Sequence, residues 1–278
     1  MKLPLCLLVD NGSLQPEAIF SLRMVAKNLT SLTPFSVVPL GLLHSNKIEQ
    51  NQLGGEPGGT ISTFLSSELG EAEDELLILP FFLGPSRGVT GWLMEKLEGW
   101  RTEKKGRSYR VLNCLHENGE DRLTKALYDE INKICKSKGL INPSVAMVDH
   151  GTPVKEVNRV RENVGLSLHG LLSGGVSKFS TCSMERREGE KYAFNDPLLE
   201  QVLNQWGLDG CGEVVVALFF LMSGRHAGEG GDLARICQSA EEKFPKMKIF
   251  RTQPLGGNQL VLSILKDKLE SIKNVYDL

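Results

Sequence analysis

Short continuous apolar runs recur along the chain, and a polar or glycine-rich turn follows each of them. The clearest runs span residues 3–9, 76–83, 145–148 and 214–222, and their length is typical of strands buried on both faces. Between the runs, apolar residues recur every 3 or 4 positions, which predicts amphipathic helices, the first of them starting near Pro16. Alternating strands and helices predict a mostly parallel sheet covered on both faces, because parallel strands need crossover connections. We therefore expect the α/β class.

The hydrophobic pattern also repeats. The run 76–83 resembles the run 214–221, and an offset of 138 positions relates Arg87 to Arg225. The same offset continues through the last strand, loop and helix of the two halves. An offset held over several elements indicates an internal repeat. We expect two similar doubly wound parallel-sheet domains related by internal duplication, and their bounds are 1–138 and 139–278.

Two histidines follow strand runs in the second half. His150 comes after the first run and His226 after the third, and the turns at these strand ends should line one crevice. Two imidazoles that face one space can bind a divalent metal or accept protons near neutral pH. For either histidine alone, an ordinary polar loop residue is the favoured interpretation, but the equivalent positions of the two favour a functional pair. The first half has Asn11 and Gly88 instead, so we expect one catalytic half and one structural or substrate-covering half.

Composition narrows the class of protein. The 278 residues carry a formal net charge of −2, which argues against a basic face that binds nucleic acid. The apolar runs are far shorter than the roughly 20 residues that a bilayer requires, and residues 3–9 lack the features of a signal peptide. The six cysteines are scattered without a C-x-x-C pair, which is typical of the cytoplasm. We expect a cytoplasmic protein without a membrane partner, either a monomer or a homodimer.

Three segments of the second half carry a family resemblance. Residues 148–153, 183–187 and 220–232 resemble the signatures of the sirohydrochlorin chelatases, which are class II chelatases, and the first half resembles a degenerate copy of the same module. The resemblance implies insertion of a divalent metal substrate, Fe²⁺ or Co²⁺, into sirohydrochlorin for siroheme or cobalamin synthesis. It implies that His150 and His226 hold the entering metal and take the pyrrole protons. Glu185 is the implied third member, although a solvated loop acid is an equal alternative.

The remaining candidates concern the substrate and other ligands. Sirohydrochlorin bears many carboxylates, so a basic rim of Arg225 and Arg186 is expected, although the counterpart of Arg225 at Arg87 suggests a structural role. The glycine-rich stretch 227–232 has neither a P-loop nor a dinucleotide fingerprint, so we expect no organic cofactor. Asp232 is expected to be a helix N-cap.

Alternative interpretations remain at this point. The same fold could serve a non-catalytic tetrapyrrole- or metal-binding protein, since the first half keeps the scaffold without the histidines. Chelation of another tetrapyrrole is a weaker alternative. The other histidines are His44, His116 and His169, and we expect them to be structural or surface residues. His44 corresponds loosely to the region of Glu185.

Overall fold

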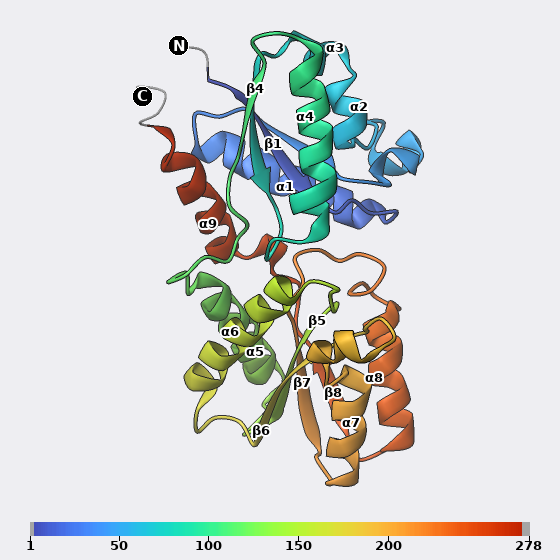
Figure 1. Cartoon of the computed structure of the whole chain (residues 1–278). Helices are drawn as coiled ribbons and strands as arrows, with labels where there is room; N and C mark the ends of the chain where they lie inside the picture. The colour runs from blue at the N-terminus through green and yellow to red at the C-terminus, as the bar shows by residue number, and fades with distance from the viewer. Residues whose placement is uncertain (1–2, 274–278) are drawn as a thin grey trace. The chain divides into compact units, whose positions relative to one another are not determined.

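The computed structural model describes residues 3–273, which form two compact units (Figure 1). The first unit comprises the chain through Asn118 together with the segment from Gly256 onward, and the second unit is Gly119–Leu255. Each unit contains one four-stranded parallel sheet, with the strand orders β2-β1-β3-β4 and β6-β5-β7-β8. The predicted α/β class with two similar doubly wound parallel sheets is confirmed.

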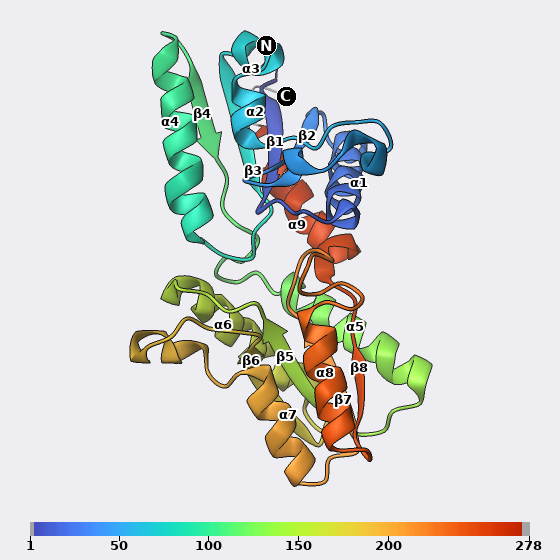
Figure 2. The same cartoon turned by 90° about the vertical axis from the view of Figure 1, so that its right-hand side faces the viewer.

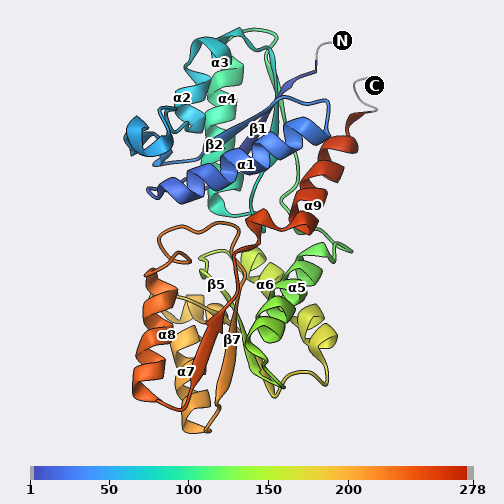
Figure 3. The same cartoon turned by 180° about the vertical axis from the view of Figure 1, so that it is seen from behind.

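In the first unit, helices cover both faces of the sheet. Helices α1 and α9 pack together on one face, and α2, α3 and α4 lie on the other (Figures 1 and 3). The strands are β1 (Leu5–Asp10), β2 (Val37–Gly41), β3 (Glu75–Pro80) and β4 (Ser108–Val111). The helices are α1 (Pro16–Leu32), α2 (Ile61–Leu65), α3 (Glu68–Ala72), α4 (Met94–Glu103) and α9 (Gln259–Glu270).

The second unit has the same layers. Helices α7 and α8 cover one face of its sheet, and α5 and α6 cover the other (Figure 2). The strands are β5 (Ser144–Asp149), β6 (Lys178–Ser183), β7 (Glu213–Leu218) and β8 (Lys248–Arg251). The helices are α5 (Arg122–Lys138), α6 (Lys155–Leu172), α7 (Leu199–Leu208) and α8 (Asp232–Lys243).

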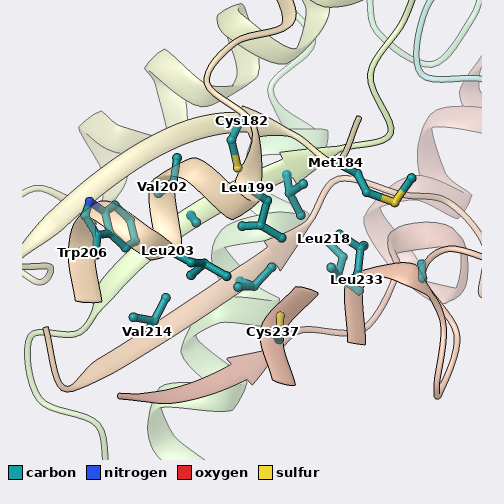
Figure 4. Close-up of a cluster of buried hydrophobic side chains, with 14 of the residues drawn as sticks. Cys182, Met184, Leu199, Val202, Leu203, Trp206, Val214, Leu218, Leu233 and Cys237 are labelled. Carbon is teal, nitrogen blue, oxygen red and sulfur yellow. The ribbon is translucent and has the colours of Figure 1, made fainter. Parts of the chain in front are cut away.

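Burial on both faces explains the apolar runs. All residues of β5 are buried because this central strand has a neighbour on each side and helices above and below. On the face of α7 and α8, a cluster of buried side chains joins the sheet to both helices (Figure 4). Val202, Leu203 and Trp206 come from α7, and Leu233 and Cys237 come from α8. The same cluster includes Val148 and Leu218, which lie at the carboxyl ends of β5 and β7, the strands that the two histidines follow.

The compact units do not coincide with the two halves of the sequence. Helix α5 belongs to the sequence range 1–138, yet it packs on α6 and β7 of the second unit. Helix α9 belongs to the range 139–278, yet it packs on α1 of the first unit. The two halves have therefore exchanged their last helices. The bounds of the ancestral repeat, 1–138 and 139–278, stay a prediction.

Two further predictions from composition concern the cysteines and the membrane. The six cysteines are all unpaired, and four of them are buried. Among residues 3–273, no helix has both the length and the apolar character needed to cross a bilayer.

Candidate functional site

The strand ends of the second unit bring the two predicted histidines together. His150 follows β5 directly, and His226 lies in the loop between β7 and α8. Their ring centroids are 4.6 Å apart and the ring planes are inclined by 60°. The strand order explains this proximity, because β5 and β7 are hydrogen-bonded neighbours whose carboxyl ends lie at the same edge. The two imidazoles therefore share one space.

A carboxylate orients the ring of His226. The Oδ2 atom of Asp232 lies 2.6 Å from Nδ1 of His226, so the ring donates its Nδ1 proton to the carboxylate. This hydrogen bond to His226 is the main reason why the pKa of Asp232 lies below its ordinary value. With Nδ1 protonated, the lone pair of the neutral ring is on Nε2, where it can bind a metal or accept a proton.

The prediction that Asp232 is a helix N-cap was wrong. Gly231 occupies the N-cap position of α8, and Asp232 is the first helical residue. A Cβ atom on Gly231 would lie 2.6 Å from the carbonyl oxygen of Arg225 and 2.7 Å from that of His226. The absence of a side chain at this position lets the histidine loop pass against the start of the helix. The glycine-rich stretch thus brings Asp232 within reach of His226.

His150 has its own carboxylate neighbour. Its Nδ1 atom is 3.2 Å from the carbonyl oxygen of Gly151, and its Nε2 atom is 3.4 Å from Oε1 of Glu185. If Nδ1 donates to the carbonyl, two lone-pair atoms, Nε2 and Oε1, face each other, and a proton or a cation between them is favourable. Gly151 has a φ of +90°, and a Cβ on it would lie 1.9 Å from the carbonyl oxygen of Glu185. The loops carrying His150 and Glu185 are therefore in direct backbone contact.

The site is open to solvent. The side chains of His150 and Glu185 are 46% and 61% exposed, and that of His226 is 31% exposed. Within residues 3–273, no group of three or more histidine, cysteine, aspartate and glutamate side chains has the spacing of a metal site. The arrangement is a pair of imidazoles, one backed by Asp232 and the other facing Glu185.

The two predicted arginines lie beside this pair. The Arg225 side chain is 78% exposed, and its Nε atom is 3.9 Å from Oδ2 of Asp232. Arg186 is more restrained, since its Nε donates to Oδ1 of Asp196 at 2.8 Å and its Nη1 to the carbonyl of Gly189 at 3.1 Å. Arg225 has the freedom to reach a ligand, whereas Arg186 also holds its own loop together. Carboxylate binding by either arginine stays a prediction.

A buried network beneath His150 was not anticipated from the sequence. The guanidinium of Arg161, whose side chain is 1% exposed, lies 3.4 Å from Oδ1 of Asp149, contacts the Ser183 hydroxyl, and donates to the carbonyl of Asn195 at 3.1 Å. The Ser183 hydroxyl donates to Asp149 at 2.8 Å. Burial raises the pKa of Asp149, although Arg161 and the Ser183 hydroxyl oppose the rise. The side-chain oxygen of Asn195 accepts a hydrogen bond from Thr152 N–H, and the side-chain NH₂ group of Asn195 donates one to the carbonyl of Thr152.

The network fixes the backbone on both sides of His150. Asp149 precedes the histidine, and Thr152 follows two residues later. A charged residue on the buried face of an amphipathic helix was the one signal in the sequence, since Arg161 lies among the core positions of α6. Its partners come from β5, β6 and the loop before α7, which no local pattern reveals.

The first unit repeats this backbone without the chemistry. Leu43 N–H donates to the carbonyl of Asn11, just as Glu185 N–H donates to that of His150. Leu43 therefore corresponds to Glu185, and His44, the next residue, lies in the expected region without being the direct counterpart.

Asn11 and Gly88 lie side by side, as the two histidines do in the second unit. A Cβ on Gly88 would be 3.8 Å from Oδ1 of Asn11 and 2.7 Å from Cδ1 of Leu42. The side chain of Leu42 thus fills part of the space that a histidine at position 88 would need. The first unit has no imidazole at either strand end.

A family model matches the second half of the chain, and solved structures resemble the fold of the whole chain. Residues 144–272 match the family model of CbiX. The solved structure of SirB from Bacillus subtilis with Fe³⁺ is 15% identical, with a TM-score of 0.70 over 96% of this chain and 94% of that one. The sirohydrochlorin chelatase SirB from Bacillus subtilis subspecies spizizenii in complex with cobalt is 14% identical, with a TM-score of 0.68 and the same coverage.

A third structure extends the comparison. CbiX, described as the terminal enzyme for biosynthesis of siroheme in denitrifying bacteria, is 12% identical, with a TM-score of 0.62 over 96% of this chain and 98% of that one. No sequence among the curated proteins matches the chain. The resemblance to the class II chelatases is confirmed by the family model for the second half and by the fold for the whole chain.

Proposed function

We propose that this chain, which has the class II chelatase fold and a second half that matches the CbiX family, inserts a divalent metal into sirohydrochlorin. The observation that carries the proposal is the pair of imidazoles, with ring centroids 4.6 Å apart, at the carboxyl edge of the second sheet. Fe²⁺ and Co²⁺ are the proposed metals, and the metal is a substrate. The solved SirB structures hold iron and cobalt, which supports this choice.

Metal insertion sets two requirements that these side chains meet. The metal must exchange its water for ligands, and the macrocycle must lose two pyrrole protons. His226 offers the lone pair of Nε2 to the metal or to a proton, and Asp232 stabilises the imidazolium that forms after proton transfer. His150 offers its Nε2 beside Glu185, whose carboxylate can balance the charge of the cation or relay the proton.

We assign the grip on the substrate to arginines beside the imidazoles. A guanidinium binds a carboxylate with two parallel hydrogen bonds, and sirohydrochlorin carries many carboxylates. Arg225 is the stronger candidate because its side chain is largely exposed and adjoins His226. Arg186 is the weaker one because Asp196 and Gly189 already use part of its hydrogen-bonding capacity.

The proposal includes an enzyme class and a cellular compartment. The reaction is that of a lyase, either a sirohydrochlorin ferrochelatase or a cobaltochelatase, and the proposed chemistry needs no organic cofactor. The six unpaired cysteines support a cytoplasmic protein, since disulfides are rare in that compartment. Metal-loaded product would serve siroheme or cobalamin synthesis. We propose that the chain acts as a monomer or a homodimer.

The experiment mixes the purified chain with sirohydrochlorin and Co²⁺ or Fe²⁺ and follows the absorption spectrum of the macrocycle. We expect faster formation of the metallated spectrum than in a buffer control. His226→Ala and His150→Ala should each slow the reaction strongly, whereas His44→Ala should leave it close to wild type. Equal effects of His226→Ala and His44→Ala would contradict the site assignment.

A second function remains because the first unit keeps the fold without imidazoles at Asn11 and Gly88. That unit shows that the scaffold does not depend on metal chemistry. A non-catalytic tetrapyrrole- or metal-binding protein would bind sirohydrochlorin or Co²⁺ stoichiometrically and give no more metallated product than the buffer control. The same spectra therefore separate the two functions.

A further inference from the structure

A cavity of about 250 Å³ lies within the first unit, and all of its lining residues belong to that unit. The carboxyl group of Asp10, at the end of β1, lines it together with the hydroxyl-bearing residues Ser13 and Ser45. Arg23 and Glu56 supply the other charged groups of its lining. Apolar residues of α1 and β2, together with Pro57 and Gly59 of the loop before α2, form the rest of the wall.

The second unit shows what occupies the corresponding place there. Asp10 pairs with Gly41 across the sheet, as Asp149 pairs with Ser183, so the two aspartates are equivalent. The buried positions of α1 and α6 superpose at an offset of 139, which makes Leu22 the counterpart of Arg161. In the second unit the guanidinium of that arginine fills the space beside the aspartate. In the first unit leucine replaces it, and the space is a cavity.

Arg23 does not replace this arginine as a cationic partner of the aspartate. Its guanidinium donates to the carbonyls of Leu53 and Glu56 at 2.9 Å and to that of Pro57 at 3.2 Å. These acceptors lie on the loop that leads to α2, and Glu56 also lies 3.8 Å from the guanidinium as an ion-pair partner. The donors of Arg23 are thus directed to that loop and to its carboxylate.

The Asp10 carboxylate is left with a single backbone donor. Gly12 N–H donates to its Oδ1 at 2.8 Å. Within residues 3–273, no lysine or arginine forms an ion pair with it. Asp149 differs, because it receives hydrogen bonds from Ser183, Gly151 and the guanidinium of Arg161. Asp10 is half-buried at the cavity wall, and a carboxylate that is largely removed from water without a cationic partner is costly unless a ligand supplies one.

We propose that this cavity binds a small organic cation of the alkylguanidinium class, which takes the place that the Arg161 guanidinium occupies in the second unit. The planar N–H donors of the ligand would reach the Asp10 carboxylate and the Ser45 hydroxyl, and its alkyl part would lie against Leu22. The volume is below the roughly 300 Å³ at which drug-sized ligand pockets begin, so the ligand has few heavy atoms. This site is independent of metal insertion.

The ionisation of Asp10 gives the site a pH signature. Burial raises the pKa of Asp10 to about 6, and the hydrogen bond from Gly12 opposes that rise. Arg23 and Glu56 are the other charged groups that line the cavity. A guanidinium binds the carboxylate and not the neutral acid. We therefore expect affinity at pH 5 to be about tenfold weaker than at pH 7.5, because only about a tenth of Asp10 is then ionised.

The experiment titrates the full chain with methylguanidinium, at concentrations far below those that unfold proteins, and follows amide resonances and heat of binding. Methylurea, which has the same shape without the charge, is the ligand control. Asp10→Asn removes the carboxylate, and Leu22→Arg places a guanidinium in the cavity from the chain itself. Asp129→Asn is the matched control, since Asp129 is an exposed aspartate on α5 of the second unit.

We expect saturable one-to-one binding of methylguanidinium with shifts at the Gly12 and Ser45 amides. Binding should weaken at least tenfold in Asp10→Asn and in Leu22→Arg, and it should be unchanged in Asp129→Asn. No saturable binding, equal binding of methylurea, or unchanged affinity in Asp10→Asn would each overturn the proposal. If Leu22→Arg does not fold, the comparison of Asp10→Asn with Asp129→Asn still decides. A protein inactive with sirohydrochlorin would leave these results untouched.

Discussion

Replacing Asp232 by asparagine tests whether the orientation of His226 matters for metal insertion. The substitution keeps the size of the side chain and removes the charge that accepts the Nδ1 proton at 2.6 Å. An asparagine can turn its NH₂ group toward Nδ1, which would move the ring proton to Nε2 and block the metal ligand. The expected effect is therefore on the reactivity of His226 and not on the fold.

The size of the effect follows from the hydrogen bond and its exposure. A hydrogen bond to a charged group contributes roughly 1.5–3 kcal/mol. Because the side chains of His226 and Asp232 are 31% and 26% exposed, solvent screening favours the lower part of this range. A loss of about 1.5–2 kcal/mol corresponds to a rate lower by about 10- to 30-fold. The usual loss on removing a partner of a metal-binding histidine is about 10- to 100-fold, which agrees.

The assay is the initial rate of Co²⁺ insertion into sirohydrochlorin, followed by absorption, with the free energy of unfolding measured in parallel. Asp209→Asn is the control, because Asp209 is also an aspartate that pairs with a basic side chain, Lys178. It should retain the wild-type rate. The reasoning is refuted if Asp232→Asn stays within twofold of wild type while His226→Ala is strongly impaired.

Three further substitutions test the buried groups and the loop geometry. Arg161→Leu leaves the buried Asp149 carboxylate without its cation and should lower the free energy of unfolding in urea by about 3 kcal/mol, with partial recovery when Asp149→Asn is added. The pKa of Asp10 is about 6 in the folded chain, against an ordinary value of 3.8. Between these two pH values the folded chain binds more protons than the unfolded chain, so the free energy of unfolding falls as the pH rises from about 4 to about 6. Asp10→Asn should therefore gain about 3 kcal/mol over wild type between pH 4 and pH 7, and a pH-independent difference in denaturation would contradict this. Gly151→Ala places a Cβ 1.9 Å from the carbonyl oxygen of Glu185 at a φ of +90°. It should lower the free energy of unfolding by about 2 kcal/mol or more and slow metal insertion. Gly170→Ala, on an open helix face, should leave the free energy of unfolding unchanged or raise it.

Much of the fold was predictable because its signals are local. Strands covered on both faces must be apolar throughout, so β5 and β7 stand out as runs at 145–148 and 214–222. The rule that ligands bind at the carboxyl ends of parallel strands then selected His150 and His226 before their distance was known. The contrast with Asn11 and Gly88 followed from the same repeat.

Contacts between distant segments were not predictable. Helices α5 and α9 are both amphipathic, and such a pattern shows which face of a helix is buried but not which sheet buries it. The pairing of Arg161 with Asp149 depends on packing between α6 and β5. The role of Asp232 depended on the fold of a glycine-rich loop, and its position at a helix start suggested an N-cap instead.

The exchange of the last helices also determines the order in which the units are completed during synthesis. The second unit is one uninterrupted segment, Gly119–Leu255, so all of its parts have been synthesised before α9 is made. The first unit begins earlier in the chain but lacks its helix α9, which packs on α1, until almost the whole chain has been translated. The unit that carries the histidines is thus the first to have its complete set of helices, and the amino-terminal sheet waits with the face beside α1 incompletely covered.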